Sequence, residues 1–330
     1  MVKDYAKLFE HIVTETANYV TRNKLQAMVL GISGGIDSTV CAAICREVST
    51  HTGVPLIGRS LSTKHNKEGE INAADLVGNA FCNSYMKVDI QTMYTQILYG
   101  IGQAEHSCMD MTGNVEYDIH GEFPKQQTPI ANGNIQARLR MIYLYNLASI
   151  HKGFVIDTDN RTENMLGYWT LHGDVGDFKP IGDLWKTEVF KLAEWLLSYY
   201  SFQLPHNMYE ATAEQLEKAG KVFQQGKAIK ESLKLKPTAG LGITSNDLEE
   251  LGAESYDQVD GILQEFEAWQ WLNFRHGKTF TSGKEERDAF LEEQQMLCYP
   301  IEVIVSVIDK YYKSTFKRMP VPLIFVNKLV

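Results

Sequence analysis

The first half of the chain alternates short hydrophobic runs with amphipathic helical patterns. Hydrophobic residues at helical spacing predict a helix over residues 4–22, another from Asp37 onward, and a third over residues 72–82. Short hydrophobic runs bounded by polar residues predict buried strands at residues 27–32, 54–57, 85–88 and 153–156. Strands that alternate with helices through short connections are typical of a doubly wound, mostly parallel sheet, so we expect an α/β fold.

Residues 134–148 predict a helix with more hydrophobic surface than one sheet can cover. Its two hydrophobic stripes consist of Ala137, Met141, Leu144 and Ala148, and of Ile135, Leu139 and Ile142. One stripe can pack on the sheet, and we expect a second subunit to cover the other. Burial under a local loop is the alternative. The polar residues 105–133 before this helix are predicted to form a loop.

The second half of the chain contains two long charged segments without recognisable motifs. Residues 200–235 and 262–299 have helix-forming composition and largely polar patterns. We interpret both as peripheral helical insertions within a single domain that spans residues 1–330, with binding to a partner as the alternative.

The composition narrows the classes of function and location. The chain has 330 residues and a net charge of −9, and no Lys- or Arg-rich run interrupts this acidic background, so we expect no nucleic-acid partner. No hydrophobic run reaches the roughly 18 residues of a membrane span. The N-terminus shows no signal-like segment, so we expect a cytoplasmic location. Five cysteines without a C-x-x-C pair indicate neither a disulfide framework nor a zinc site.

A turn with the sequence S-G-G-I-D-S, residues 33–38, separates the first predicted strand from the next helix. Paired glycines let a ligand approach the backbone closely, and the first N–H groups of a helix lack intrahelical partners. With the hydroxyls of Ser33 and Ser38, the turn therefore favours a phosphate group. The Asp37 carboxylate would repel a bare phosphate, which indicates a Mg²⁺ ion between them. The alternative is an ordinary Gly-Gly turn before a capped helix.

A second polar segment, D-T-D-N-R-T-E at residues 157–163, follows the strand predicted at residues 153–156. It lies at the carboxyl end of that strand, where doubly wound sheets bind their ligands. A helix N-cap is the alternative interpretation, with Thr158 or Asp159 as the cap and Glu163 closing a capping box.

A further helix is predicted where Trp185, Val189, Leu192 and Leu196 share one face. Lys186 stands in its first turn, where the helix dipole disfavours a cation. We therefore expect an anion to bind beside this lysine.

Taken in order, the motifs resemble those of the NAD⁺ synthetase family, within the ATP pyrophosphatase superfamily. The matching stretches are S-G-G-x-D-S at 33–38, N-I-x-A-R-x-R-M at 134–141, T-D-N-R-x-E at 158–163, P-I-G-D-L-x-K-T-x-V at 180–189, P-T-A-G-L at 237–241 and K-R-x-P at 317–320. The resemblance extends over about residues 5–325 and is interrupted by the two motif-free segments.

The resemblance implies which residues bind ATP, Mg²⁺ and the substrate deamido-NAD⁺. The ATP contacts would be Gly31, Ile32, Ser33, Gly34, Gly35, Ile36, Asp37, Ser38, Thr158, Lys186 and Thr238. Asp37 and Glu163 would hold Mg²⁺, and with Lys186 they form the implied catalytic group. Deamido-NAD⁺ would meet a second set of residues in a groove between the subunits of a homodimer, namely Arg138, Asp177 and Lys317.

Two positions depart from the pattern of the family. Leu171 stands where many members have a substrate-facing lysine, and Phe316 stands where many shorter members have a histidine. Both departures fall on the deamido-NAD⁺ side, whereas the ATP side is intact.

The reaction that the resemblance implies is ATP-dependent amidation of deamido-NAD⁺ through an acyl-adenylate, with release of AMP and pyrophosphate. Because no stretch of the chain reads as a glutamine-hydrolysing domain, we expect ammonia as the nitrogen donor. Within the superfamily, a GMP synthetase-like amidotransferase or a tRNA-modifying thiolase is the alternative, and a non-catalytic nucleotide sensor is the alternative from another class.

Overall fold

The fold is centred on a parallel sheet of four strands. A computed structural model describes residues 3–109, 129–204, 212–236, 247–293 and 299–318. The strands are β1 (Met28–Gly31), β2 (Leu56–Ser62), β3 (Ser84–Asp89) and β4 (Phe154–Ile156), in the order β3-β2-β1-β4. Met28 of β1 pairs with Leu56 on one side and with Phe154 on the other, so β1 lies in the interior of the sheet. The α/β class and the parallel sheet are confirmed.

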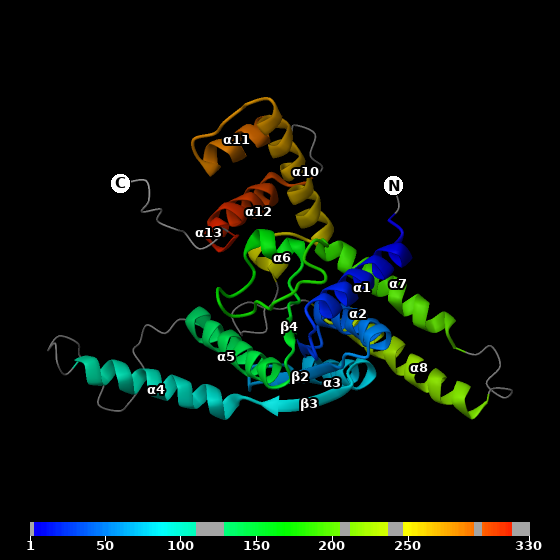
Figure 1. Cartoon of the computed structure of the whole chain (residues 1–330). Coiled ribbons are helices and arrows are strands. Elements are labelled where there is room, and N and C mark those ends of the chain that lie inside the picture. The colour runs from blue at the N-terminus through cyan, green and yellow to red at the C-terminus, as the bar shows by residue number, and fades with distance from the viewer. Residues whose placement is uncertain (1–2, 110–128, 205–211, 237–246, 294–298, 319–330) are drawn as a thin grey trace, which may run out of the picture.

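Helices cover both faces of this sheet, as a doubly wound fold requires (Figure 1). The helices on one face are α1 (Tyr5–Arg22), α2 (Ile36–Thr52), α3 (Glu68–Phe81), α7 (Lys186–Phe202) and α8 (Ala213–Lys234). The opposite face is covered by α4 (Gln91–Met109) and α5 (Pro129–Ile150). Successive residues of a strand point to opposite faces, so Met28 and Leu30 enter the first core whereas Val29 enters the second.

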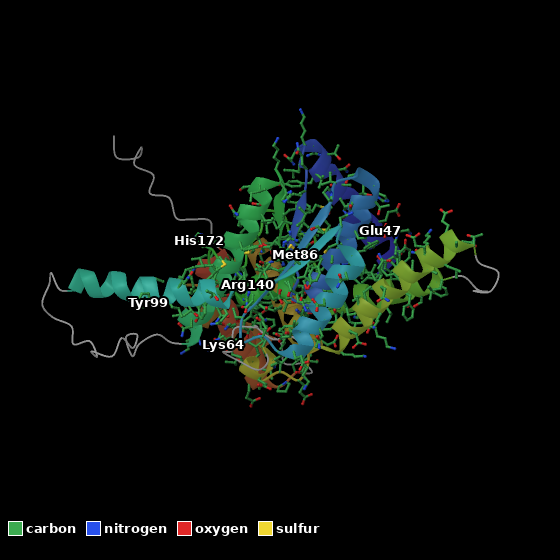
Figure 2. All side chains as sticks on the ribbon, turned by 90° about the horizontal axis from the view of Figure 1, so that it is seen from below. Glu47, Lys64, Met86, Tyr99, Arg140 and His172 are labelled. Carbon is green, nitrogen blue, oxygen red and sulfur yellow. The ribbon has the colours of Figure 1, made fainter. Side chains whose placement is uncertain are left out.

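The prediction of a loop over residues 105–133 is wrong at both ends of that range, where the structure has helices. Helix α4 continues to Met109, and α5 already begins at Pro129, whose fixed φ suits the first turn of a helix. Residues 110–128 lie outside the described part of the chain. Figure 2 shows α4 reaching outward from the sheet, with the 63 % exposed Tyr99 on it.

Helix α5 buries only part of its hydrophobic surface within the chain. Leu139, Leu144 and Ala148 are buried, because they pack on β1 and β4. Ile142 and Ile150 are 62 % and 66 % exposed. Leu139 therefore belongs to the core of the chain, and within its predicted stripe it is Ile142 that remains open to a second subunit.

Residues 200–235 differ from the expectation of a peripheral insertion. Helix α8 packs along α3 and α7, and its Val222, Ala228 and Ile229 are buried in the core of the first face. The Oγ of its Ser232 lies 2.8 Å from Oγ1 of Thr39 on α2. Because most residues of α8 are polar or charged, its buried stripe could not be recognised in the sequence.

A third core joins the helices of the C-terminal part, which form a layer of their own beside the sheet domain (Figure 1). Its helices are α6 (Arg161–Leu166), α9 (Asp247–Leu251), α10 (Tyr256–Arg275), α11 (Gly283–Glu293) and α12 (Ile301–Lys313), followed by α13 (Thr315–Arg318). Phe266, Trp269 and Phe290 pack edge to face or stacked at its centre. Among the described helices, none is both long and hydrophobic enough to cross a membrane.

Candidate active site

The path of the chain through the sheet creates a place for a ligand. From β1 the chain moves outward to β2 and β3 and then returns to β4 on the other side of β1. The helix that follows β1, α2, and the helix that precedes β4, α5, cover opposite faces of the sheet, so the carboxyl ends of the two strands border a crevice. The turn at 33–38 follows β1, and the segment at 157–163 follows β4, so both predicted polar segments reach the same crevice.

The turn after β1 needs its first glycine for steric reasons. Gly34 has a φ of +83°, and a Cβ atom there would lie 2.5 Å from the carbonyl oxygen of Glu70 and 2.7 Å from the amide nitrogen of Ala74. Gly35 is the N-cap of α2 and carries no side chain to bond the first N–H groups of that helix. The Ser33 and Ser38 hydroxyls lie 3.0 Å apart across the turn. The result is a polar concave turn suited to an anion.

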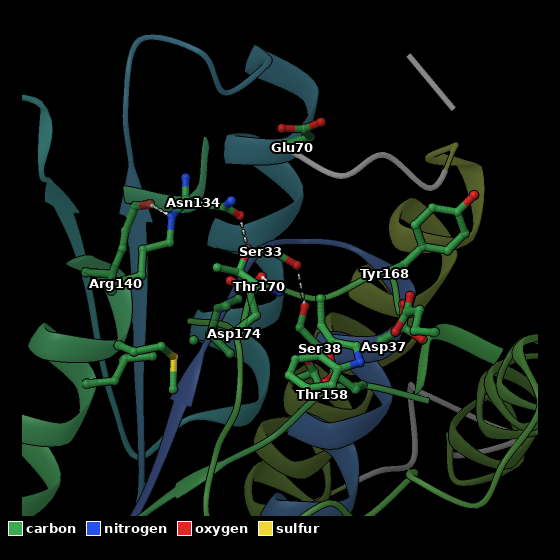
Figure 3. A pocket seen from close by; sticks show the side chains of 18 of the residues that line it. Ser33, Asp37, Ser38, Glu70, Asn134, Arg140, Thr158, Tyr168, Thr170 and Asp174 are labelled. Carbon is green, nitrogen blue, oxygen red and sulfur yellow. Dashed lines mark hydrogen bonds between the residues drawn. The ribbon is translucent and has the colours of Figure 1, made fainter. Parts of the chain in front are cut away.

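A cavity of about 470 Å³ opens above this turn, within the size range of small-molecule sites (Figure 3). The predicted residues that line it are Gly31, Ile32, Ser33, Asp37, Ser38, Thr158, Glu163 and Lys317. Trp169 also lines it, and its buried Nε1 has no hydrogen-bond partner among the described residues. An unpaired buried donor favours a polar ligand in the cavity.

Asp37, Glu163 and Lys186 meet at one point beside the cavity. Nζ of Lys186 lies 2.6 Å from Oδ2 of Asp37 and 2.9 Å from Oε1 of Glu163. The lysine is 2 % exposed and therefore depends on both carboxylates for its partners. Asn160 adds a hydrogen bond from Nδ2 to Oδ1 of Asp37, at 2.9 Å.

Burial alters the protonation of this group. It raises the pKa of Glu163 to about 7, against the opposing effect of Lys186 and with a further increase from Asp37. Burial lowers the pKa of Lys186, but the two carboxylates more than offset this, so its pKa lies well above the ordinary value. The lysine therefore stays charged, and it forms a cluster of one cation and two carboxyl groups.

Helix α6 begins with an N-cap and a capping box, as predicted, but the N-cap is a different residue from the two that were predicted. Asn160, not Thr158 or Asp159, is the N-cap, and its side chain accepts a hydrogen bond from the Glu163 N–H. Oε2 of Glu163 accepts from the Asn160 N–H at 3.2 Å, whereas Oε1 faces Lys186. The Glu163 carboxylate thus closes the capping box with one oxygen and faces Lys186 with the other. The two interpretations of this segment are therefore compatible.

A second charged cluster lies at the same strand end. Lys179 Nζ lies 2.9 Å from Oδ2 of Asp159 and 3.2 Å from Oδ2 of Asp157. Burial raises the pKa of both carboxyl groups, and Lys179 opposes that increase. Asp157 also accepts hydrogen bonds from the N–H groups of Asp159 and Gly176. This cluster fixes the loop after β4 against the segment that follows it.

The residues predicted for deamido-NAD⁺ are spread over the region rather than gathered in one place. Lys317 donates hydrogen bonds to the carbonyls of Gly167 and Trp169 at the rim of the cavity. Arg138 donates to the carbonyl of Leu171, and Asp177 accepts from the N–H of Val155. Neither Arg138 nor Asp177 lines the described cavity. Thr238 lies outside the described residues.

Arg140 is a site residue that the sequence did not distinguish from a solvated charge. It lines the cavity together with Asn134 and Asp174 (Figure 3). Its Nε donates to the carbonyl of Leu61, and burial lowers its pKa. Its place on the buried side of α5 could have been predicted from helical spacing, since Ala137 three residues before it and Leu144 four residues after it are both buried.

Comparison with known proteins identifies the family of this chain. The profile of the NAD synthase family matches residues 8–320. The NH(3)-dependent NAD(+) synthetase of Methanocaldococcus jannaschii is 29 % identical over 319 residues, which cover 95 % of this chain and 96 % of the relative.

Two solved structures share the fold across nearly the whole chain. The NMN synthetase from Francisella tularensis aligns with a TM-score of 0.63 and 21 % identity, over 98 % of this chain and 100 % of that one. The NH3-dependent NAD synthetase from Campylobacter jejuni, in complex with nitrate, aligns with a TM-score of 0.58 and 21 % identity, over 97 % and 100 %. On the family match, this chain belongs to the NAD synthase family.

Proposed function

We propose that this chain amidates deamido-NAD⁺ to NAD⁺ with ATP and ammonia. The observation that carries the proposal is the meeting of Asp37, Glu163 and Lys186 beside the glycine turn that opens α2. This arrangement offers an anion site and two metal-binding carboxylates within one crevice. Membership of the NAD synthase family supplies the substrate class.

The first step requires the polyphosphate of ATP to be held so that its α-phosphorus faces the substrate carboxylate. We assign the β and γ phosphates to the N–H groups at the start of α2 and to the hydroxyls of Ser33 and Ser38, which lie together in one turn. An oxygen of the nicotinic acid carboxylate attacks the α-phosphorus, and the bond to the bridging oxygen of pyrophosphate breaks. Lys186 opposes the negative charge that develops on the leaving group.

In the second step, ammonia attacks the acyl carbon of the adenylate, AMP leaves with the former carboxylate oxygen, and one proton is released. No covalent bond to the protein is needed. The chain therefore acts by positioning and by electrostatic stabilisation.

Asp37 and Glu163 suit a Mg²⁺ ion as well as they suit Lys186. One or two carboxylates plus substrate phosphates are the usual ligands of this ion in nucleotide sites. Each directs one oxygen to Nζ of Lys186, and both side chains are partly exposed to the cavity, at 16 % and 20 %, so a Mg²⁺ ion would meet them from the cavity side. When bound, Mg²⁺ supplies positive charge that stabilises the phosphate oxygens.

We place the substrate side of the reaction between Lys317 at the rim and the open face of α5. Arg138 is exposed on that helix, and Ile142 is exposed one turn further along. A second copy of the chain packed on this face would cover the exposed hydrophobic surface and bring Arg138 and Asp177 into a shared groove. The functional unit is therefore a homodimer.

The test is a complete reaction with each component omitted in turn. We expect NAD⁺ only when the chain, ATP, Mg²⁺, ammonium and deamido-NAD⁺ are all present. Nicotinic acid mononucleotide, which carries the same ring carboxylate without the adenosine half, serves as the comparison substrate. A strong preference for it would contradict the dinucleotide as substrate and leave the adenylating chemistry intact. No amide product from either substrate would contradict the proposed function.

A further inference from the structure

The two turns that carry Glu163 and Lys186 are joined by a carboxylate from a different helix. Asp260 lies on α10 and is 1 % exposed. Its Oδ1 accepts a hydrogen bond from Oγ1 of Thr162 at 2.5 Å, and its Oδ2 accepts one from the Thr187 N–H at 2.9 Å. Thr162 precedes Glu163 on α6, and Thr187 follows Lys186 on α7.

The Thr162 hydroxyl completes the link. It accepts a hydrogen bond from the Lys186 N–H at 2.9 Å while it donates to Asp260. The first turns of α6 and α7 are therefore both bonded to the buried Asp260 carboxylate, through Thr162 beside Glu163 and through Thr187 beside Lys186. Asp260 itself does not line the cavity.

Helix α10 is held rigidly enough to act as a support. Its Phe266 and Trp269 are buried in the third core against Phe290 of α11. An ion pair between α6 and α10 reinforces the link, because Arg161 at the start of α6 bonds both oxygens of Glu267 at 3.0 and 2.9 Å. The opposite end of α6 is bound to the same layer, since Ser314 donates to the carbonyl of Met165.

We propose that Asp260 is a positioning residue, which acts through Thr162 to hold Glu163 and Lys186 in the geometry that binds the metal and polyphosphate of ATP. This inference rests on the proposed function for the identity of the nucleotide. It also gives the helical layer of residues 256–318 a role, since α10 cannot present Asp260 without the core that fixes it.

The physical reason is the sensitivity of such a cluster to small displacements. Glu163 faces Lys186 with one oxygen and the Asn160 N–H with the other, so a shift of α6 against α7 lengthens contacts on both sides. A misplacement of about 1 Å in a catalytic arrangement can cost on the order of a hundredfold in rate.

The sharpest variant is Thr162→Val, which keeps the shape of the side chain and removes the hydroxyl that joins Asp260 to Lys186. Thr162→Ser retains that hydroxyl and serves as the matched rescue. Asp260→Asn is the second variant, because an amide can accept from only one of the two donors and turns its NH₂ toward the other. Glu293→Gln on α11 is the control for the helical layer. It weakens only the hydrogen bonds that Glu293 accepts from Trp269 and Lys278.

Two measurements are made on each variant of the full chain. The first is the steady-state rate of AMP formation at varied ATP concentrations, from which kcat and the KM for ATP are obtained separately. The second is the increase in thermal unfolding temperature that ATP causes with and without Mg²⁺, which requires no turnover.

We expect Thr162→Val and Asp260→Asn to lower kcat by about ten- to a hundredfold and to raise the KM for ATP by at least about tenfold, because both variants disturb the geometry that binds the metal and polyphosphate. The Mg²⁺-dependent part of the thermal shift should largely disappear in both. Thr162→Ser and Glu293→Gln should match the parent in both measurements. Equal behaviour of Thr162→Val and Thr162→Ser would overturn the proposal, as would a loss of activity with an unchanged Mg²⁺-dependent shift.

The two measurements separate this proposal from the proposed function. A parent that forms no AMP but is stabilised by ATP with Mg²⁺, in a manner lost in Thr162→Val, would contradict the reaction and support the positioning role. A parent that ATP with Mg²⁺ does not stabilise would contradict both.

Discussion

Nζ of Lys186 lies 2.6 Å from Oδ2 of Asp37, although the two residues are 149 positions apart in the chain. With Glu163 ionised, the cluster of Asp37, Glu163 and Lys186 carries one net negative charge. A triphosphate without a divalent cation would add like charge to it, whereas a metal ion would neutralise both. We therefore expect nucleotide binding to depend on the metal.

The first prediction concerns the two carboxylates. Asp37→Asn and Glu163→Gln should each lose at least about a hundredfold in turnover, because a positioned metal is worth several kcal/mol in the transition state. Glu217→Gln on the exposed side of α8 is the matched control and should keep parental activity. Retention of more than about a tenth of parental turnover in either site variant, a loss of about 1.4 kcal/mol or less, would contradict the metal role.

The second prediction concerns the pH dependence of stability without nucleotide. Burial raises the pKa of Glu163 from the ordinary 4.5 to about 7. Between these values the folded protein keeps a proton that the unfolded chain has lost. The free energy of unfolding contributed by this group therefore falls as pH rises from 4.5 to about 7, and is level above it.

Urea unfolding of the parent and of Glu163→Gln over this pH range measures the effect. Glutamine does not titrate, so the stability of the parent relative to this variant should decline with rising pH and then become constant. A relative stability that stays constant, or rises with pH, would show that Glu163 keeps an ordinary or lowered pKa.

The third prediction concerns the open face of α5. Ile142 is 62 % exposed, so Ile142→Glu should shift light-scattering mass from dimer to monomer and leave the thermal unfolding of the monomer nearly unchanged. Phe223→Glu, a 57 % exposed position on α8, is the control and should remain dimeric. Leu139→Glu should instead prevent folding, because Leu139 is buried within the chain. A parent that is monomeric at micromolar concentration and fully active would refute the dimer.

Much of this site could be predicted from the sequence because its chemistry is local. The turn at 33–38 and the segment at 157–163 each place several polar groups next to one strand end, and periodicity identified those strands. Parallel pairing then brings the strand ends together without further information.

The remainder depends on contacts between distant segments. Asp260 stands in an unremarkable amphipathic helix, and only the packing of α10 on α6 and α7 brings it to Thr162. The cap at Asn160 was missed for a smaller reason, since Thr158, Asp159 and Asn160 are all good N-cap residues and only backbone geometry decides among them. In α8, lysines and glutamines on the outer face outnumbered the residues that it buries.

The fourth prediction concerns the nitrogen donor. With this chain of 330 residues, ammonium should support NAD⁺ formation, and glutamine freed of ammonia should not. Among the described cysteines, Cys41 and Cys45 are fully buried, and burial raises the pKa of each thiol, which leaves them poor nucleophiles for glutamine hydrolysis. Equal rates with both donors, with the glutamine rate abolished by a thiol alkylator, would contradict this.

The most direct test of the adenylation chemistry follows one oxygen atom. Deamido-NAD⁺ with ¹⁸O in the nicotinic acid carboxylate is incubated with the chain, ATP, Mg²⁺ and ammonium, and the products are analysed by mass spectrometry. The proposed mechanism predicts one ¹⁸O atom in the phosphate of AMP and none in pyrophosphate. ADP and phosphate as products, or AMP without the label, would contradict it.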